Sequence, residues 1–254
     1  MATYSKIPYW QKEVIMKSII VSYFSDVGDS TYYSDHGKRL SKELETLGDR
    51  YSIVGLKGHN DYRANCLSKP LFIREMYHKY KQNIVWLDVD SLVHKSLEMF
   101  DWCLEQAKVT CASHHDTHQK VAPQQVTMMK ASPIGFRYCD EVTEFIDAWV
   151  IDCQDDAKNG GNNFDHEVLL SKTLPQFANK LSFVLLDNRW CCWPGRTGPD
   201  TYITMGLADN ESKRKGLINM GLTGDTLNCQ LVGNDRMERD YENASGGKPV
   251  QSAT

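Results

Sequence analysis

Four consecutive apolar residues, at positions 84–87, lead directly into Asp88, Val89 and Asp90. A short continuous apolar run that ends at polar residues is typical of a buried strand. In open α/β sheets, ligands bind outside the carboxyl ends of the strands. The segment therefore predicts a buried strand that carries two acidic side chains to the ligand-binding edge of a sheet.

The residues before this run predict a β-α-β arrangement. Segments 17–25 and 51–58 have the composition of strands, and between them leucines recur at helical spacing until Gly48, a typical helix stop. A second helix is expected to begin at Lys69-Pro70, with Ser68 as its cap, and to lead into the apolar run. The acids would then follow the third strand.

The second half of the chain continues the alternation. Segments 108–114, 125–132 and 181–186 are expected to be strands, and 136–152 and 165–174 helices. Alternating strands and helices predict an α/β fold with right-handed crossovers, and hairpin-like later strands make the sheet mixed. We expect one domain over residues 1–232, followed by a flexible polar tail over residues 233–254.

Composition excludes several classes of function. The 254 residues carry a formal net charge of −4, so no general attraction to nucleic acid is expected. No apolar run approaches the roughly 20 residues that cross a bilayer, and no signal-peptide core is visible, so a cytoplasmic protein is expected. The eight cysteines form no Cys-x-x-Cys pair, which favours reduced, buried thiols over a zinc site.

The two aspartates are expected to act together. Residues two apart on a strand point to the same side, and carboxylates that close repel each other unless a cation or a shared proton relieves them. Mg²⁺ or Mn²⁺, which also binds phosphate oxygens, is the common solution.

The sequence resembles glycosyltransferases of the GT-A fold, a Rossmann-like mixed sheet flanked by helices. The central element of the resemblance is IVWLDVDSLV, which is similar to their Asp-x-Asp strand. The supporting segments, in chain order, are SYFSDVG (22–28), KPLFIREM (69–76), TMMKASPIGF (127–136), NNFDHEVLL (162–170) and LSFVLLDNRWCCWP (181–194).

The resemblance implies a metal-dependent transfer of sugar from a nucleotide-diphospho-sugar, most often a UDP-sugar, with Mn²⁺ or Mg²⁺ at the diphosphate. A carboxylate near the acceptor hydroxyl could take its proton. The residues it assigns are Asp165 and Glu167 to catalysis; Tyr23, Phe24, Lys69, Asp88, Lys213 and Arg214 to the donor; and Asp88, Asp90 and Asp209 to the metal.

The chain departs from the family pattern in one respect. Many of these enzymes complete the metal site with a late histidine, but no histidine follows His166, and Asp209 stands near the expected place. The acceptor stays open between a glycan, a lipid-linked sugar, a protein side chain and a modified base.

Other interpretations of the same residues remain. Asp165 and Glu167 also fit the first turn of a helix, where acids are favoured, and Tyr23 and Phe24 also fit a core. The histidines of HHDTH (114–118) lack the fixed geometry of a zinc site. Two other functions are weighed: a haloacid-dehalogenase-like phosphatase, whose first motif also has two aspartates after a strand, and a GT-A-like module that binds without turnover.

Overall fold

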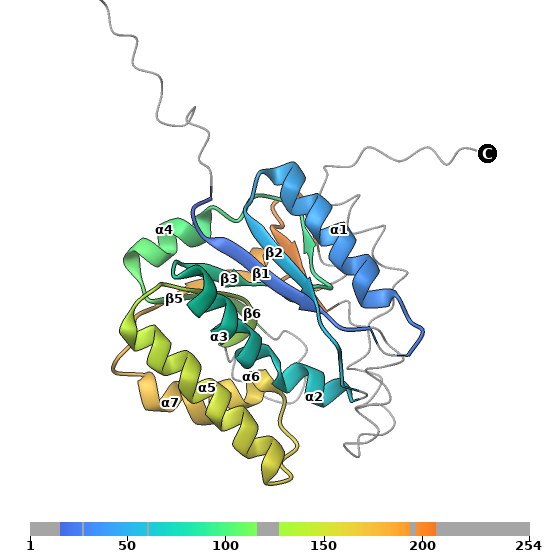
Figure 1. Cartoon of the computed structure of the whole chain (residues 1–254). Coiled ribbons are helices and arrows are strands. Elements are labelled where there is room, and N and C mark those ends of the chain that lie inside the picture. The colour runs from blue at the N-terminus through green and yellow to red at the C-terminus, as the bar shows by residue number, and fades with distance from the viewer. Residues whose placement is uncertain (1–15, 27, 60, 116–126, 194–196, 207–254) are drawn as a thin grey trace, which may run out of the picture.

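The computed structural model describes residues 16–26, 28–59, 61–115, 127–193 and 197–206, and their centre is a six-stranded sheet (Figure 1). The sheet order is β2-β1-β3-β6-β5-β7, in which β6 runs antiparallel to both of its neighbours and the other pairs are parallel. This confirms the mixed α/β sheet. Its strands are β1 (Ile19–Phe24), β2 (Tyr51–Gly55), β3 (Ile84–Trp86), β5 (Val109–His115), β6 (Thr127–Phe136) and β7 (Phe183–Leu186).

Helices cover both faces of the sheet. They are α1 (Tyr32–Leu47), α2 (Tyr62–Leu67), α3 (Lys69–Tyr80), α4 (Met99–Gln106), α5 (Asp140–Lys158), α6 (Asp165–Val168) and α7 (Leu174–Phe177), with a π-helical turn η2 (Leu169–Thr173) between the last two and a 3-10 turn η3 (Asn188–Trp190) after β7. A two-stranded sheet pairs β4 (Leu92–Val93) with β8 (Ile203–Thr204). No helix in the described ranges is long and apolar enough to span a membrane.

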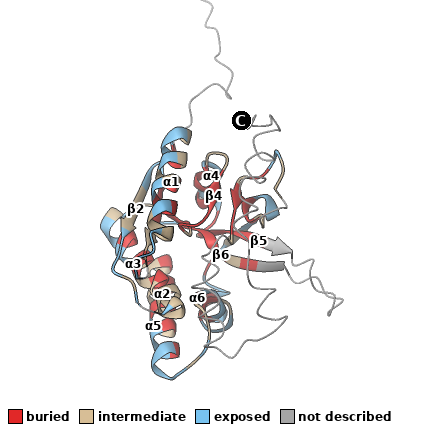
Figure 2. Cartoon of the chain, turned by 90° about the vertical axis from the view of Figure 1, so that its right-hand side faces the viewer, coloured by how far each residue is buried: buried red, intermediate tan, exposed pale blue. Residues whose placement is uncertain are grey.

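Two apolar cores form on the two faces because side chains alternate along each strand. On β3, Ile84 and Trp86 join the core under α3 and α5, whereas Val85 points into the core under α1 and α4. Figure 2 shows the buried residues gathered along the strands and the exposed ones on the helices. The apolar run therefore forms a strand buried on both faces, as its sequence predicted.

The first helix follows its sequence signals closely. Leu40 and Leu44 are fully buried, and the helix ends where Gly48 adopts the left-handed conformation at φ 75°. A side chain is disfavoured at that angle, so the glycine allows the chain to turn into β2.

Ser68 is the N-cap residue of α3, as predicted, but its side chain does not cap the helix. A short helix, α2, precedes α3, and the hydroxyl of Ser68 donates a hydrogen bond back to the carbonyl of Ala64 at 2.9 Å instead of capping α3. The signal for α2 lay in Asp61, whose carboxylate accepts from the amide of Ala64 at 2.8 Å as an N-cap.

Two further segments differ from the prediction. Strand β6 continues past Pro133 to Phe136, so helix α5 begins later than expected, at Asp140. A proline cannot donate to a sheet, but the pairing of β5 with β6 shifts register between Cys111 and Ser113, opposite this stretch. The expected helix 165–174 is divided by the π-helical turn.

Acid should destabilise the fold through a buried histidine on α1. His36 is 6% exposed, and burial first, with the charge of Arg39 second, lowers its pKa from 6.5 to about 4. The unfolded chain then binds more protons between these pH values, so the free energy of unfolding falls as pH falls from 6.5 to 4. Between pH 7 and pH 4.5, the free energy of unfolding measured in urea should fall by about 2 kcal/mol less in His36→Gln than in the wild type.

The exposed His78 on α3 provides the control, since His78→Gln should follow the wild type. Equal acid sensitivity of the wild type and His36→Gln would contradict the prediction.

Candidate active site

Asp88 and Asp90 lie at the carboxyl end of the central strand β3, but in a turn beyond it. The strand ends at Trp86, and the amide of Ser91 donates to the carbonyl of Asp88 at 3.0 Å. The expectation that both acids project from one side of a strand is therefore wrong, because the chain has already turned. Their position at the sheet edge agrees with the prediction, with Asp90 buried and Asp88 about one-third exposed.

Two neighbours fix the orientation of Asp88. Its amide donates to the hydroxyl of Ser132 on β6 at 2.9 Å, and its Oδ1 accepts from the indole Nε1 of Trp86 at 2.9 Å. Strand β6 can supply this hydroxyl because it runs antiparallel beside β3. The backbone and the side chain of Asp88 are thus both held.

Lys69 joins Asp88 to a second carboxylate. Its ammonium Nζ lies 3.1 Å from Oδ1 of Asp88 and 2.9 Å from Oδ2 of Asp165, with about a tenth of its side chain exposed. The ammonium also lies 5.7 Å from the ring centroid of Trp86. Burial alone would lower the pKa of Lys69, but the charges of Asp165 and Asp88 outweigh it and hold the pKa well above its usual value.

Asp165 begins helix α6 and is 2% exposed. Its carbonyl accepts from the indole Nε1 of Trp149 on α5 at 3.0 Å, which fixes the start of α6 against the core. A carboxylate at this depth needs a charged partner, and Lys69 is that partner. The structure therefore brings together Lys69, Asp88 and Asp165 from three distant segments.

Glu167 has a different environment. It is exposed, and its Oε2 accepts from the amide of Phe164 at 2.8 Å, as the acid of a helix N-terminus does. This contact agrees with the alternative interpretation of Glu167 as an acid in the first turn of a helix. A catalytic role of Glu167 stays a prediction.

Tyr23 and Phe24 point to opposite faces of the sheet, so they cannot stack on one base together. Tyr23 packs on Phe72 and Trp86, and its hydroxyl donates to the carbonyl of Asn65 at 2.6 Å. Phe24 lies in the other core, against α1 and β2. Both fill cores here, and their contact with a donor stays a prediction.

The remaining predicted residues lie outside the described ranges. These are Asp209, Lys213 and Arg214, and also positions 116–118 of the histidine-rich segment. Within the described part of the chain, no group of three or more His, Cys, Asp or Glu side chains is placed to hold a metal ion.

Helix α2 adds residues to the site that the sequence analysis missed. Burial first, and then nearby groups that include the carboxylates of Asp90 and Asp88, raise the pKa of Tyr62 well above its usual value. Burial and the charge of Asp165 likewise raise the pKa of the Cys66 thiol. Both groups therefore stay protonated.

Comparison with known proteins supports the fold. No family model and no curated protein matches the sequence. Among solved structures, the chain is similar to a glycosyltransferase involved in the glycosylation of the major capsid of PBCV-1. The TM-score is 0.57 at 10% sequence identity, and the match covers 80% of this chain and 99% of that one. The protein thus has the fold of a glycosyltransferase of known structure.

Removing the ammonium should be costly. Lys69→Met leaves Asp165 buried without its cation, and breaking a buried ion pair from one side costs about 3–5 kcal/mol. Since Asp88 keeps some solvent, we expect a loss of about 3 kcal/mol in urea unfolding at pH 7.

Two variants test the cause. Lys69→Met combined with Asp165→Asn should recover part of the loss, because position 165 then no longer buries an unpaired charge. Lys38→Met removes an exposed pair with Asp35 and should leave unfolding unchanged. A double variant that is no more stable than Lys69→Met would contradict the ion-pair explanation.

Proposed function

We propose that the protein is a metal-dependent glycosyltransferase that moves a sugar from a nucleotide-diphospho-sugar, a UDP-sugar in the first instance, to an acceptor hydroxyl. The observation that carries the proposal is the cluster of Lys69, Asp88 and Asp165 at the carboxyl end of β3. The fold, shared with a glycosyltransferase, supports it. The acceptor, whether a glycan, a lipid-linked sugar, a protein or a modified base, is left open.

We propose that carboxylate oxygens of Asp88 and Asp90 bind a hard divalent cation. Lys69 and Trp86 both approach Oδ1 of Asp88, and no described contact uses its Oδ2. Together with Asp90, this oxygen would hold Mn²⁺ or Mg²⁺, which takes few protein carboxylates when phosphates complete its shell. The ion would supply electrostatic stabilisation of the departing diphosphate. Asp209 is proposed as a further ligand.

The protein's own residues would divide the remaining work. The carboxylate of Asp165 is buried and already contacts the ammonium of Lys69, so Asp165 is assigned to stabilisation of positive charge at the reacting sugar carbon and not to proton removal. Lys69 keeps Asp88 and Asp165 at fixed positions and could contact the donor. Glu167, which is exposed on the same helix turn, is the candidate to take the acceptor proton.

A binding module without turnover is the second candidate function, and the absence of a late histidine favours it. The two differ in one observable, since an enzyme consumes the donor and a module only protects it. The phosphatase alternative would require hydrolysis of phosphomonoesters and gains no support from the fold likeness.

Donor binding tests the metal assignment. UDP-, GDP- and CMP-sugars are compared by thermal unfolding with Mn²⁺ and with chelator, and one nucleotide class should stabilise the wild type only with metal. A ligand at a hundred times its Kd adds about 2.7 kcal/mol. Asp90→Ala should lose this stabilisation, whereas Asp147→Ala, which removes a partly exposed acid of α5, should keep it. Full metal-dependent stabilisation of Asp90→Ala would contradict the assignment.

Turnover tests Asp165. Asp165→Asn keeps the shape of the side chain and leaves Asp88 and Asp90 in place, so donor binding should persist. Release of UDP from the stabilising UDP-sugar should fall on the order of 10²-fold, as when one charge-stabilising group is removed from an active site. Unchanged release would exclude Asp165 from catalysis. Donor binding without any release by the wild type would favour the binding module.

A further inference from the structure

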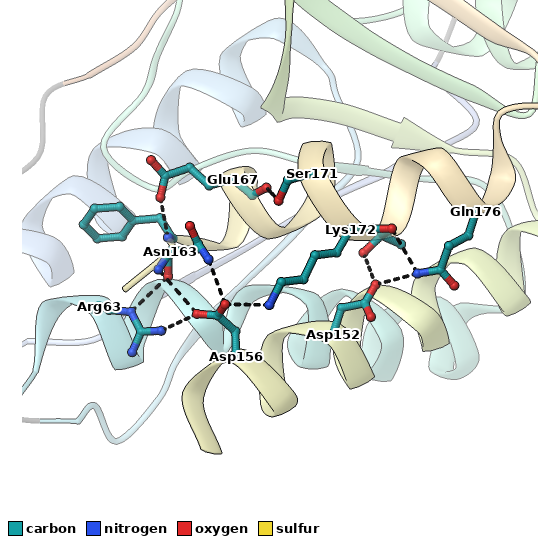
Figure 3. A network of polar contacts seen from close by, with 10 residues as sticks. Arg63, Asp152, Asp156, Asn163, Glu167, Ser171, Lys172 and Gln176 are labelled. Atoms are coloured by element: carbon teal, nitrogen blue, oxygen red, sulfur yellow. Dashed lines mark hydrogen bonds and ion pairs between the residues drawn. The ribbon is translucent and has the colours of Figure 1, made fainter. Parts of the chain in front are cut away.

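A second buried ionic cluster lies near the candidate site and takes no part in the proposed chemistry. The carboxylate of Asp156, in the last turn of α5, has 2% of its surface exposed. Arg63 Nη2 lies 2.6 Å from its Oδ2, and Lys172 Nζ lies 2.7 Å from its Oδ1 (Figure 3). These two cations come from α2 and from the π-helical turn η2, so one carboxylate connects three elements.

The cluster also holds the loop that leads to Asp165. The side-chain Nδ2 of Asn163 donates to Oδ1 of Asp156 at 2.8 Å, and the backbone amide of Asn163 donates to Oδ2 of Asp156 at 3.3 Å. On the other side, Nε of Arg63 donates to the carbonyl of Asn163 at 2.9 Å. The amide and the carbonyl of Asn163 are therefore both fixed just before Asp165 (Figure 3).

The loop packs on this carboxylate without spare room. A Cβ placed on Gly161 would meet the carboxyl atoms of Asp156 at 2.5–2.6 Å, and the amide of Gly161 donates to the carbonyl of Asp156 at 2.8 Å. Burial alone would raise the pKa of Asp156, but hydrogen bonds from Lys172 and Asn163 outweigh it and lower the pKa to about 2. Asp156 therefore stays ionised, and the loop packs directly against its carboxylate.

The segments that carry Lys69 and Asp165 are both connected to Asp156 through neighbouring residues. Arg63 belongs to α2, which ends next to Lys69, and Asn163 closely precedes Asp165. The ion pair itself spans 2.9 Å, a distance that a small shift of either segment would change.

We propose that Asp156 is a positioning residue of the candidate active site, which with Arg63 and Asn163 sets the place of Asp165 relative to Lys69. The effect of Asp156 on turnover rests on the proposed function. Loss of the anion releases the loop and leaves two cations without their partner. The donor's diphosphate, held at Asp88 and Asp90, stays bound. Turnover therefore falls while the KM for the donor changes little.

A matched control lies on the same helix. Asp152 accepts from Thr173 at 2.7 Å and from Gln176 at 3.1 Å, so it joins α5 to the same π-helical region. Its described contacts do not reach the loop before Asp165 (Figure 3). Asp152→Asn therefore removes a partly buried carboxylate of the same helix without releasing that loop.

The first measurement is hydrogen exchange of the amides at 161–168 in the free full-length protein, which needs no ligand. Exchange in this segment should become faster in Asp156→Asn and stay unchanged in Asp152→Asn. The second measurement is UDP release from UDP-glucose or UDP-galactose with Mn²⁺. In Asp156→Asn, kcat should fall about 100-fold, as expected for a small misplacement of a catalytic group, with KM nearly unchanged.

Arg63→Gln keeps the Lys172 pair and provides a second variant if Asp156→Asn does not fold; it should show the same two changes to a smaller degree. Equal exchange at 161–168 in the Asp156 and Asp152 variants, or equal loss of kcat, would overturn the inference. If Asp165→Asn loses activity and Asp156→Asn does not, only this inference fails. If Asp165→Asn keeps full activity, the catalytic role of Asp165 fails with it; if the wild type binds the donor but releases no UDP, the proposed function fails.

Discussion

The candidate site depends on one buried ammonium between two carboxylates. Lys69 stands at the first residue of α3, where the helix dipole disfavours a cation, and burial disfavours its charge further. The charges of Asp165 and Asp88 outweigh the effect of burial and keep the pKa of Lys69 high. The start of α3, the turn after β3 and the start of α6 must therefore meet at one point for the charges of Lys69 and Asp165 to be tolerated.

The sheet topology makes that meeting possible. Because β1, β2 and β3 are parallel, their carboxyl ends share one edge, and antiparallel β6 brings Ser132 to the same edge from the opposite direction. The irregular pairing near Pro133 lets β6 continue there in spite of the missing amide. The hydroxyl of Ser132 can then hold Asp88 at the place where the strand ends and the turn begins.

Much of the structure at the carboxyl ends of these strands could be predicted, because it depends on short local sequence patterns. The run at 84–87 is apolar throughout, which is sufficient to indicate a buried strand that ends before Asp88. Gly48 likewise marked the end of α1. The division of Tyr23 and Phe24 between two faces follows from strand alternation and was also within reach of the sequence.

The ion pair between Lys69 and Asp165 could not be predicted as a contact. It joins segments far apart in the chain, and their approach depends on how α2, α5 and the loop at 159–164 pack. No local pattern encodes that packing. Helix α2 was missed for a different reason, since its Asp61 cap was visible in the sequence but the helix is only six residues long.

The fold likeness does not by itself assign an activity, because one fold can support many functions. The ion pair adds an independent argument. Apolar residues of similar volume often replace a buried ion pair without loss of stability, so stability alone is a weak reason for Lys69 and Asp165 to be there. A site that must present fixed charges to a reacting sugar and a departing diphosphate does need them, since preorganised charge lowers the barrier to charge separation. Under the proposed function, the charges at the end of β3 would be retained for this preorganisation and not for stability.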